Sequence, residues 1–151
     1  MNQNIKNYLI ILLLFLFIDI PMIPIINTDM YMKEFEKINR GPMKFDDNFF
    51  ESNMFNGASL SYLLLTLGLY LFVIKPYNDI NPDKKYNSLY AYKDITIRAI
   101  LFGFVLYGFY NATNIATINE YDTTVALLDT IWGSVLCGLV TIVYFYLTNK
   151  K

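Results

Sequence analysis

The sequence predicts an all-α membrane protein, a polytopic four-helix transmembrane bundle made by one domain that spans residues 1–151. Apolar residues make up 55% of the chain and charged residues 17%, a balance too apolar for a soluble globule or a disordered chain. Four apolar runs are also long enough, or nearly so, to cross a hydrocarbon core, which needs about 20 helical residues. The runs are continuous rather than alternating, which favours helices over transmembrane strands.

The first predicted span covers residues 8–26 and is interrupted by Asp19, Pro21 and Pro24. It follows Lys6, as the apolar part of a cleaved signal peptide would. The run is long for a signal peptide, however, and no small-x-small cleavage site follows it. We therefore expect a retained span.

The other three spans are expected at residues 58–74, 97–118 and 125–147. Arg98 lies close enough to the end of the third span for its guanidinium to reach the membrane surface. Residues 119–124 are too few for more than a tight turn, so the third and fourth spans should form an antiparallel hairpin. The polar second loop is expected to cover residues 76–93.

The charges of the flanking segments predict the orientation. With four spans, the N-terminus, the second loop and the C-terminus lie on one side of the membrane, and that side carries eight Lys and Arg against three Asp. The other side carries four Lys and Arg against eight acidic residues. Because Lys and Arg are retained on the cytoplasmic side, we expect both termini to be cytoplasmic.

The long outer loop, residues 27–57, is expected to hold one short amphipathic helix. Thr28 can cap this helix, and Gly41 with Pro42 can end it. The helix could lie on the membrane surface, cover the outer mouth of the bundle, or rest on the bundle as an ordered loop. Its apolar stripe, at helical spacing, consists of Tyr31, Phe35 and Ile38.

Polar residues inside the spans are the candidate functional site. A carboxylate at mid-membrane costs about 2.5–3.5 kcal/mol on insertion scales, so it needs a partner, a proton or a function. On the predicted spans Asp19 and Asn111 lie about 10 Å below the outer surface and Asp129 about 6 Å, at the level of Ser59, Ser61 and Tyr62 on the second span. The candidate cluster consists of Asp19, Tyr107, Asn111, Asn114, Asp129 and Trp132.

Two interpretations of this cluster stay open at this point. The polar side chains can simply be hydrogen bonds between helices, or Asp19 and Asp129 can be functional carboxylates. Trp132 could donate its indole N–H to Asp129 or lie at the interface as an anchor. Tight helix packing is predicted by four pairs of small residues, Ala99/Gly103, Ala112/Ala116, Gly133/Cys137 and Ser134/Gly138.

A motif in the last two spans resembles a known family. Residues 107–117 read Tyr-Gly-x-Tyr-Asn-x-Thr-Asn-x-Ala-Thr, and residues 129–134 read Asp-x-x-Trp-Gly-Ser. This pattern resembles the predicted membrane protein family called domain of unknown function 2177, most clearly over residues 97–147. The resemblance implies a small four-span protein without an assigned activity. Asp19 matches an acidic position of the family, whereas Asn111 stands where the family usually has Asp.

Several chemistries are disfavoured. The sequence has no His, no P-loop, and no HExxH, CxxC or GxSxG motif, so we expect no enzyme, no metal site and no cofactor. A single cysteine, Cys137, excludes an intramolecular disulfide. A net charge of −1 gives no reason to expect nucleic acid as a partner.

These observations favour a structural or interaction role in the membrane. The expected partners are the lipid bilayer and either further copies of the chain or other membrane proteins. The alternative is a small proton- or cation-coupled transporter that uses Asp19 and Asp129. The abundance of Asn, Ile, Lys and Tyr is typical of an A·T-rich genome, and it leaves open a bacterial inner membrane or, for a viral protein, a host or virion membrane.

Overall fold

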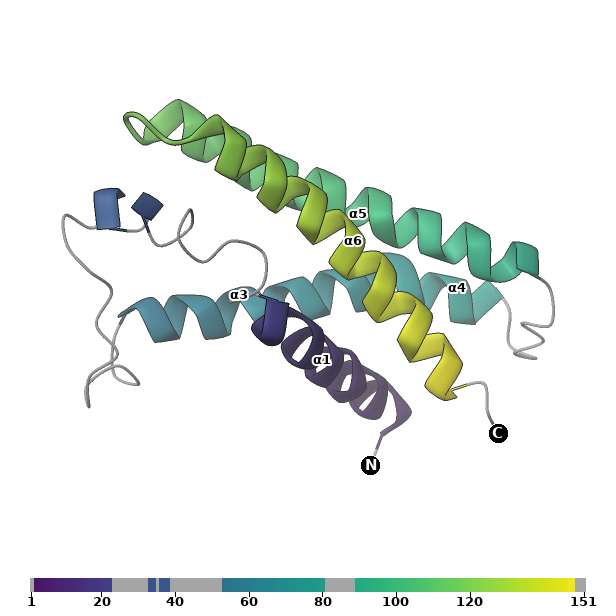
Figure 1. Cartoon of the computed structure of the whole chain (residues 1–151). Coiled ribbons are helices and arrows are strands. Elements are labelled where there is room, and N and C mark those ends of the chain that lie inside the picture. Colours follow the sequence, from purple (N-terminus) through teal and green to yellow (C-terminus); the bar gives the residue numbers. More distant parts are fainter. Residues whose placement is uncertain (1, 23–32, 35, 39–52, 81–88, 149–151) are drawn as a thin grey trace.

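A computed structural model of the chain describes residues 2–22, 33–34, 36–38, 53–80 and 89–148 (Figure 1). This part of the chain is helical and contains no strand. Four of its helical segments are long and apolar enough to cross a membrane, namely Gln3–Pro21, Phe55–Ile80, Tyr92–Thr117 and Thr123–Thr148. The predicted all-α, four-span architecture is confirmed. The side of the membrane on which the termini lie stays a prediction from the charges.

The first span is helix α1, Gln3–Met22, which begins five residues before the predicted start at Tyr8. Polar side chains in this extra turn have partners, which explains why the helix extends into it. Gln3 Nε2 donates to Asn7 Oδ1 at 2.8 Å, and the hydroxyl of Tyr70 donates to Asn4 Oδ1 at 3.0 Å. Residues 23–26 of the predicted span lie outside the described residues.

The second span is one continuous helical rod made of α3 (Asn53–Leu69), a π-helical turn η2 (Tyr70–Ile74) and α4 (Lys75–Ile80). The expectation that a polar loop begins at Pro76 is wrong. A proline inside a helix lacks an N–H, and its ring clashes with the carbonyl four residues earlier. Here the N–H of Lys75 bonds the carbonyl of Tyr70, five residues back, and this wider turn lets the helix continue through Pro76.

The third and fourth spans, α5 (Leu89–Thr117) and α6 (Thr123–Thr148), form the predicted antiparallel hairpin (Figure 1). Their closest approach is at small residues. A Cβ built on Gly103 would lie 2.5 Å from the carbonyl oxygen of Gly133 and 2.9 Å from Cα of Ser134. Ala99 is fully buried, whereas the predicted pair Ala112 and Ala116 is exposed. Of the two predicted pairs on α5, Ala99/Gly103 is therefore tightly packed and Ala112/Ala116 is not.

Helix α6 is the centre of the bundle. It lies between α5 and α1 in Figure 1, and 56% of its apolar window is buried, against 17–33% for the other three spans. Each span also exposes large apolar side chains, such as Phe17, Phe72 and Phe109, as expected of a surface that faces lipid. The core is built around Ile11, Phe15, Leu69, Ile74, Ile95, Leu136, Val140 and Phe145.

Candidate functional site

Asp19 lies near the end of α1 and joins three helices. Its Oδ2 accepts a hydrogen bond of 2.7 Å from the hydroxyl of Tyr62 on α3. Its Oδ1 accepts another of 2.7 Å from the indole Nε1 of Trp132 on α6. Both carboxylate oxygens therefore have a donor, and each donor comes from a different helix.

The hydrogen-bond partner of Trp132 differs from the predicted one. Trp132 was expected either to donate to Asp129, one turn away on α6, or to anchor at the interface. Its indole N–H bonds Asp19 on α1 instead. An indole is rigid and carries its N–H at the far edge of the ring. It therefore reaches a side chain on a neighbouring helix more readily than a short side chain on its own helix.

Asp129 is linked to α5 through Asn111, which is only 2% exposed. Asn111 Nδ2 lies 2.8 Å from Asp129 Oδ2, 3.2 Å from Thr130 Oγ1 and 3.0 Å from the carbonyl oxygen of Tyr107. Two N–H groups are thus shared among three acceptors. The hydroxyl of Tyr121, in the α5–α6 turn, donates to Asn111 Oδ1 at 3.3 Å. The Asn111 amide therefore links polar groups of α5, α6 and the turn between them.

Tyr107 lies one turn before Asn111, and its ring packs on Gly133, where an added Cβ would come within 2.2 Å of the ring. Its hydroxyl is close enough to Asp19 and to Asp129 to interact electrostatically with both. The two carboxylates also interact with each other in this way. The structure therefore brings Asp19, Tyr107, Asn111, Asp129 and Trp132 into one cluster.

Asn114 lies at the edge of this cluster. It is half-buried and hydrogen-bonds the hydroxyl of Tyr121 rather than a carboxylate. Burial raises the pKa of the Tyr121 phenol, and the hydrogen bond from Asn114 opposes that rise. Ser61, expected in the same layer, is exposed and bonds the carbonyl of Gly57 on its own helix at 2.9 Å.

The sequence does not predict Tyr121 or Thr130 as site residues. It predicts Tyr62 only to lie at the same depth as the polar cluster. Tyr121 lies outside the spans, and tyrosine is common at membrane interfaces, so no spacing rule distinguishes it. Thr130 follows Asp129 directly, and its hydroxyl also donates to the carbonyl of Ala126 at 2.8 Å. Only the crossing of the helices shows that these side chains meet.

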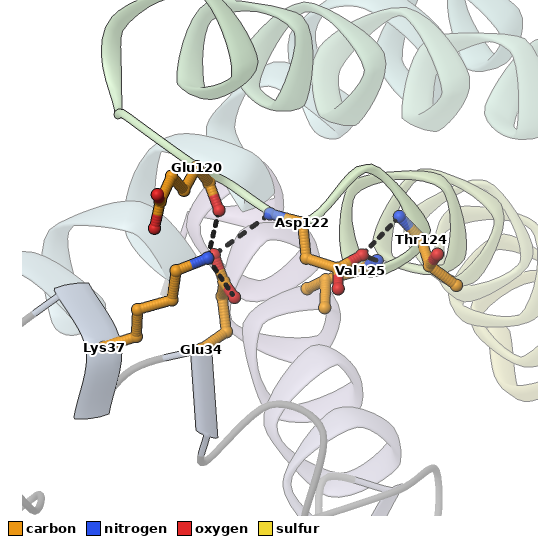
Figure 2. A network of polar contacts seen from close by, with 6 residues as sticks. All are labelled: Glu34, Lys37, Glu120, Asp122, Thr124 and Val125. Carbon is orange, nitrogen blue, oxygen red and sulfur yellow. Dashed lines mark hydrogen bonds and ion pairs between the residues drawn. The ribbon is translucent and has the colours of Figure 1, made fainter.

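Asp122 in the α5–α6 turn caps the start of α6 (Figure 2). Asp122 Oδ1 accepts the N–H groups of Thr124 at 2.7 Å and Val125 at 3.3 Å, as an N-cap does. These two bonds lower the pKa of the Asp122 carboxyl. Two residues of the outer loop contact the turn: Glu34 Oε1 accepts the N–H of Asp122 at 3.1 Å, and Lys37 Nζ donates to the carbonyl of Glu120.

The outer-loop helix is only partly described. Residues 33–34 and 36–38 are helical, within the range expected for it. Its contacts with the α5–α6 turn show that this part of the loop rests on the bundle. The other residues of that prediction, Thr28, Tyr31, Phe35, Gly41 and Pro42, lie outside the described residues.

A four-span helical bundle with a carboxylate cluster inside its apolar helices defines an integral membrane protein of the multi-pass class. The family model of DUF2177, described as a predicted membrane protein, matches residues 4–146, and the chain belongs to this family. The match covers all four spans and so extends beyond residues 97–147, where the resemblance is clearest. No curated protein and no solved structure matches the chain.

Proposed function

We propose that this protein has a structural or interaction role in its membrane and that its polar cluster fastens the four helices to one another. The observation that carries the proposal is the hydrogen bonding of Asp19. Both of its oxygens accept hydrogen bonds, one from α3 and one from α6. A carboxylate held in this way connects three helices at one point.

The energetics support this role. Lipid tails are as apolar as the core side chains, so burial alone drives helix association less in a bilayer than in water. Packing and interhelical hydrogen bonds replace it, at about 0.6–2 kcal/mol for each bond. Asp19 makes two such bonds and Asn111 connects α5 to Asp129 and Thr130 on α6. Together these contacts reach every span.

A small proton- or cation-coupled transporter is the second candidate. The observation that favours it is the presence of two carboxyl groups, Asp19 and Asp129, in one cluster. Within the described part of the chain, neither forms an ion pair with a Lys or Arg. Carboxylates without a cationic partner at membrane depth are typical of proton relays and ion sites.

Flux measurements on the purified protein in liposomes distinguish the two candidates. Wild type and Asp129→Asn are reconstituted in parallel, and proton, Na⁺ and K⁺ flux is followed with fluorescent indicators at several pH values. The structural role predicts flux equal to that of protein-free liposomes for both proteins, and a lower thermal stability of Asp129→Asn. Flux that Asp129→Asn abolishes while retaining its helical signal would overturn the structural role and establish transport.

Asp94→Asn is the matched control. Asp94 is an exposed aspartate on α5 whose ion pair with Arg98, at 2.9 Å, is solvent-exposed on both sides. Exposed pairs of this kind contribute little, about 0–1 kcal/mol. This variant should therefore leave both the stability and the flux of the protein as they are in wild type.

A further inference from the structure

We propose that the outer-loop residues 33–34 and 36–38, here called the outer strap, hold the α5–α6 turn over the polar cluster and thereby limit the access of water to Asp129. The strap and the turn are 83 and 88 residues apart in sequence at their two hydrogen bonds. Their contact is therefore a tertiary feature of the fold. The inference does not depend on whether the cluster is structural or carries ions.

The strap contacts the turn at two residues, Glu120 and Asp122 (Figure 2). Lys37 bonds the carbonyl of Glu120, the residue before Tyr121, and Glu34 bonds the N–H of Asp122, the residue after it. Glu34 is only 8% exposed, and its other oxygen lies 3.9 Å from Lys37 Nζ. One acidic and one basic side chain of the strap thus fix the backbone that carries Tyr121.

Tyr121 transmits this restraint to the cluster. Its hydroxyl bonds Asn111 Oδ1 at 3.3 Å, and Asn111 Nδ2 bonds Asp129 Oδ2 at 2.8 Å. Two hydrogen bonds therefore separate the turn from the carboxylate. If the strap is released, Tyr121 is free to leave Asn111, and the path from the outer surface to Asp129 opens.

The backbone of the turn has an uncommon conformation that its contacts with the strap stabilise. Glu120 has a φ of 59°, in the left-handed region that residues with a Cβ rarely adopt. The Lys37 ammonium bonds the carbonyl of this same residue. A turn in a disfavoured conformation stays there because surrounding contacts determine it, and the strap supplies two of them.

Chemical modification of Asp129 tests the proposal. Wild type, Glu34→Ala and Lys37→Ala are placed in phosphatidylcholine nanodiscs and treated with a water-soluble carbodiimide and an amine, and each modified carboxyl is quantified by mass spectrometry. We expect Asp129 to react about fivefold faster in both variants. Losing one net hydrogen bond, worth about 1 kcal/mol, raises the population of a locally open state by about this factor. Asp94, exposed on α5, serves as the internal reference and should react equally in all three proteins.

Two controls make the result specific. Glu36→Ala changes an exposed acidic residue of the same strap and should leave the reactivity of Asp129 unchanged. Glu34→Gln keeps an oxygen acceptor for the N–H of Asp122 and should react like wild type. Unchanged reactivity of Asp129 in both Ala variants would overturn the proposal. An equal increase in the reactivity of Asp129 in Glu36→Ala would also overturn it. The same holds if the reactivities of Asp19 and Asp129 rise together and the helical signal is lost.

Discussion

The two intramembrane carboxylates have different surroundings, although the sequence presents them as a pair. Asp19 receives its donors, Tyr62 and Trp132, from two other helices. The donor to Asp129 on α6 is Asn111 on α5, and a short turn connects these two helices. The first contact therefore joins parts of the chain that are far apart, and the second reinforces a hairpin that is already closed.

The cluster was only partly predictable at the level of residues. Asp19, Asn111 and Asp129 are identifiable because a polar side chain in an apolar run is costly and needs a reason. Tyr62 is a weaker signal, since a tyrosine hydroxyl is tolerated near a membrane surface without a specific partner. The pairing of Trp132 with Asp19 depends on how α1 crosses α6, and neither spacing nor composition records that crossing.

Asn111 and Asn114 provide a direct test at this scale. Asn111→Ala removes the donor to Asp129 and leaves a partly buried carboxylate without it, so we expect the free energy of unfolding in detergent micelles to fall by about 1–3 kcal/mol. Asn114 is half-buried, and its side chain hydrogen-bonds the turn tyrosine, Tyr121. Asn114→Ala should cost less than about 1 kcal/mol. Equal losses for the two variants would show that the Asn111 contacts contribute no specific stability.

At the level of elements, the four spans were predictable, and so were the ends of α6 and the last residue of α5 to within two residues, whereas the starts of α1 and α5 and the end of the second span were not. Long apolar runs mark a span whatever the exact packing, which is why all four were found. The continuation of the second span past Pro76 was missed because proline usually ends a helix. The π-helical turn Tyr70–Ile74 that accommodates it has no sequence signature. The polar start of α1 was missed because its amides bond each other and Tyr70.

The packing of α5 on α6 can be tested with two glycines of the same helix. A Cβ on Gly103 would meet the backbone of Gly133 and Ser134, which cannot move aside as a side chain can. We expect Gly103→Ala to destabilise the protein by about 1–3 kcal/mol, despite the higher helix propensity of alanine. Thermal unfolding followed by circular dichroism measures the effect.

Gly108→Ala is the control for this substitution. A Cβ there would lie 3.6 Å from the Thr130 methyl group, an ordinary contact. This variant should be as stable as wild type or up to about 1 kcal/mol more stable, because alanine is the better helix former. A Gly103→Ala variant that unfolds at the same temperature as Gly108→Ala would contradict the close approach of the two helices.

For the whole molecule, helix α6 organises the bundle. It is the most buried span, it forms the hairpin with α5, and it carries Trp132, which reaches α1. The second span joins the same arrangement through Tyr62 and Asp19. The family match over residues 4–146 covers this entire assembly, in agreement with a single four-span architecture. The orientation in the membrane still rests on the charges of the loops.

The measurement that tests the fastening role of the cluster most directly is a double-mutant cycle between Asp19 and Tyr62. The free energies of unfolding of Asp19→Ala, Tyr62→Phe and the double variant are compared with that of wild type in the same micelles. The structure predicts that the two substitutions are not additive, with a coupling energy of about 1–3 kcal/mol, because they remove the same interhelical bond. Additive losses would contradict a role of Asp19 in fastening α1 to α3.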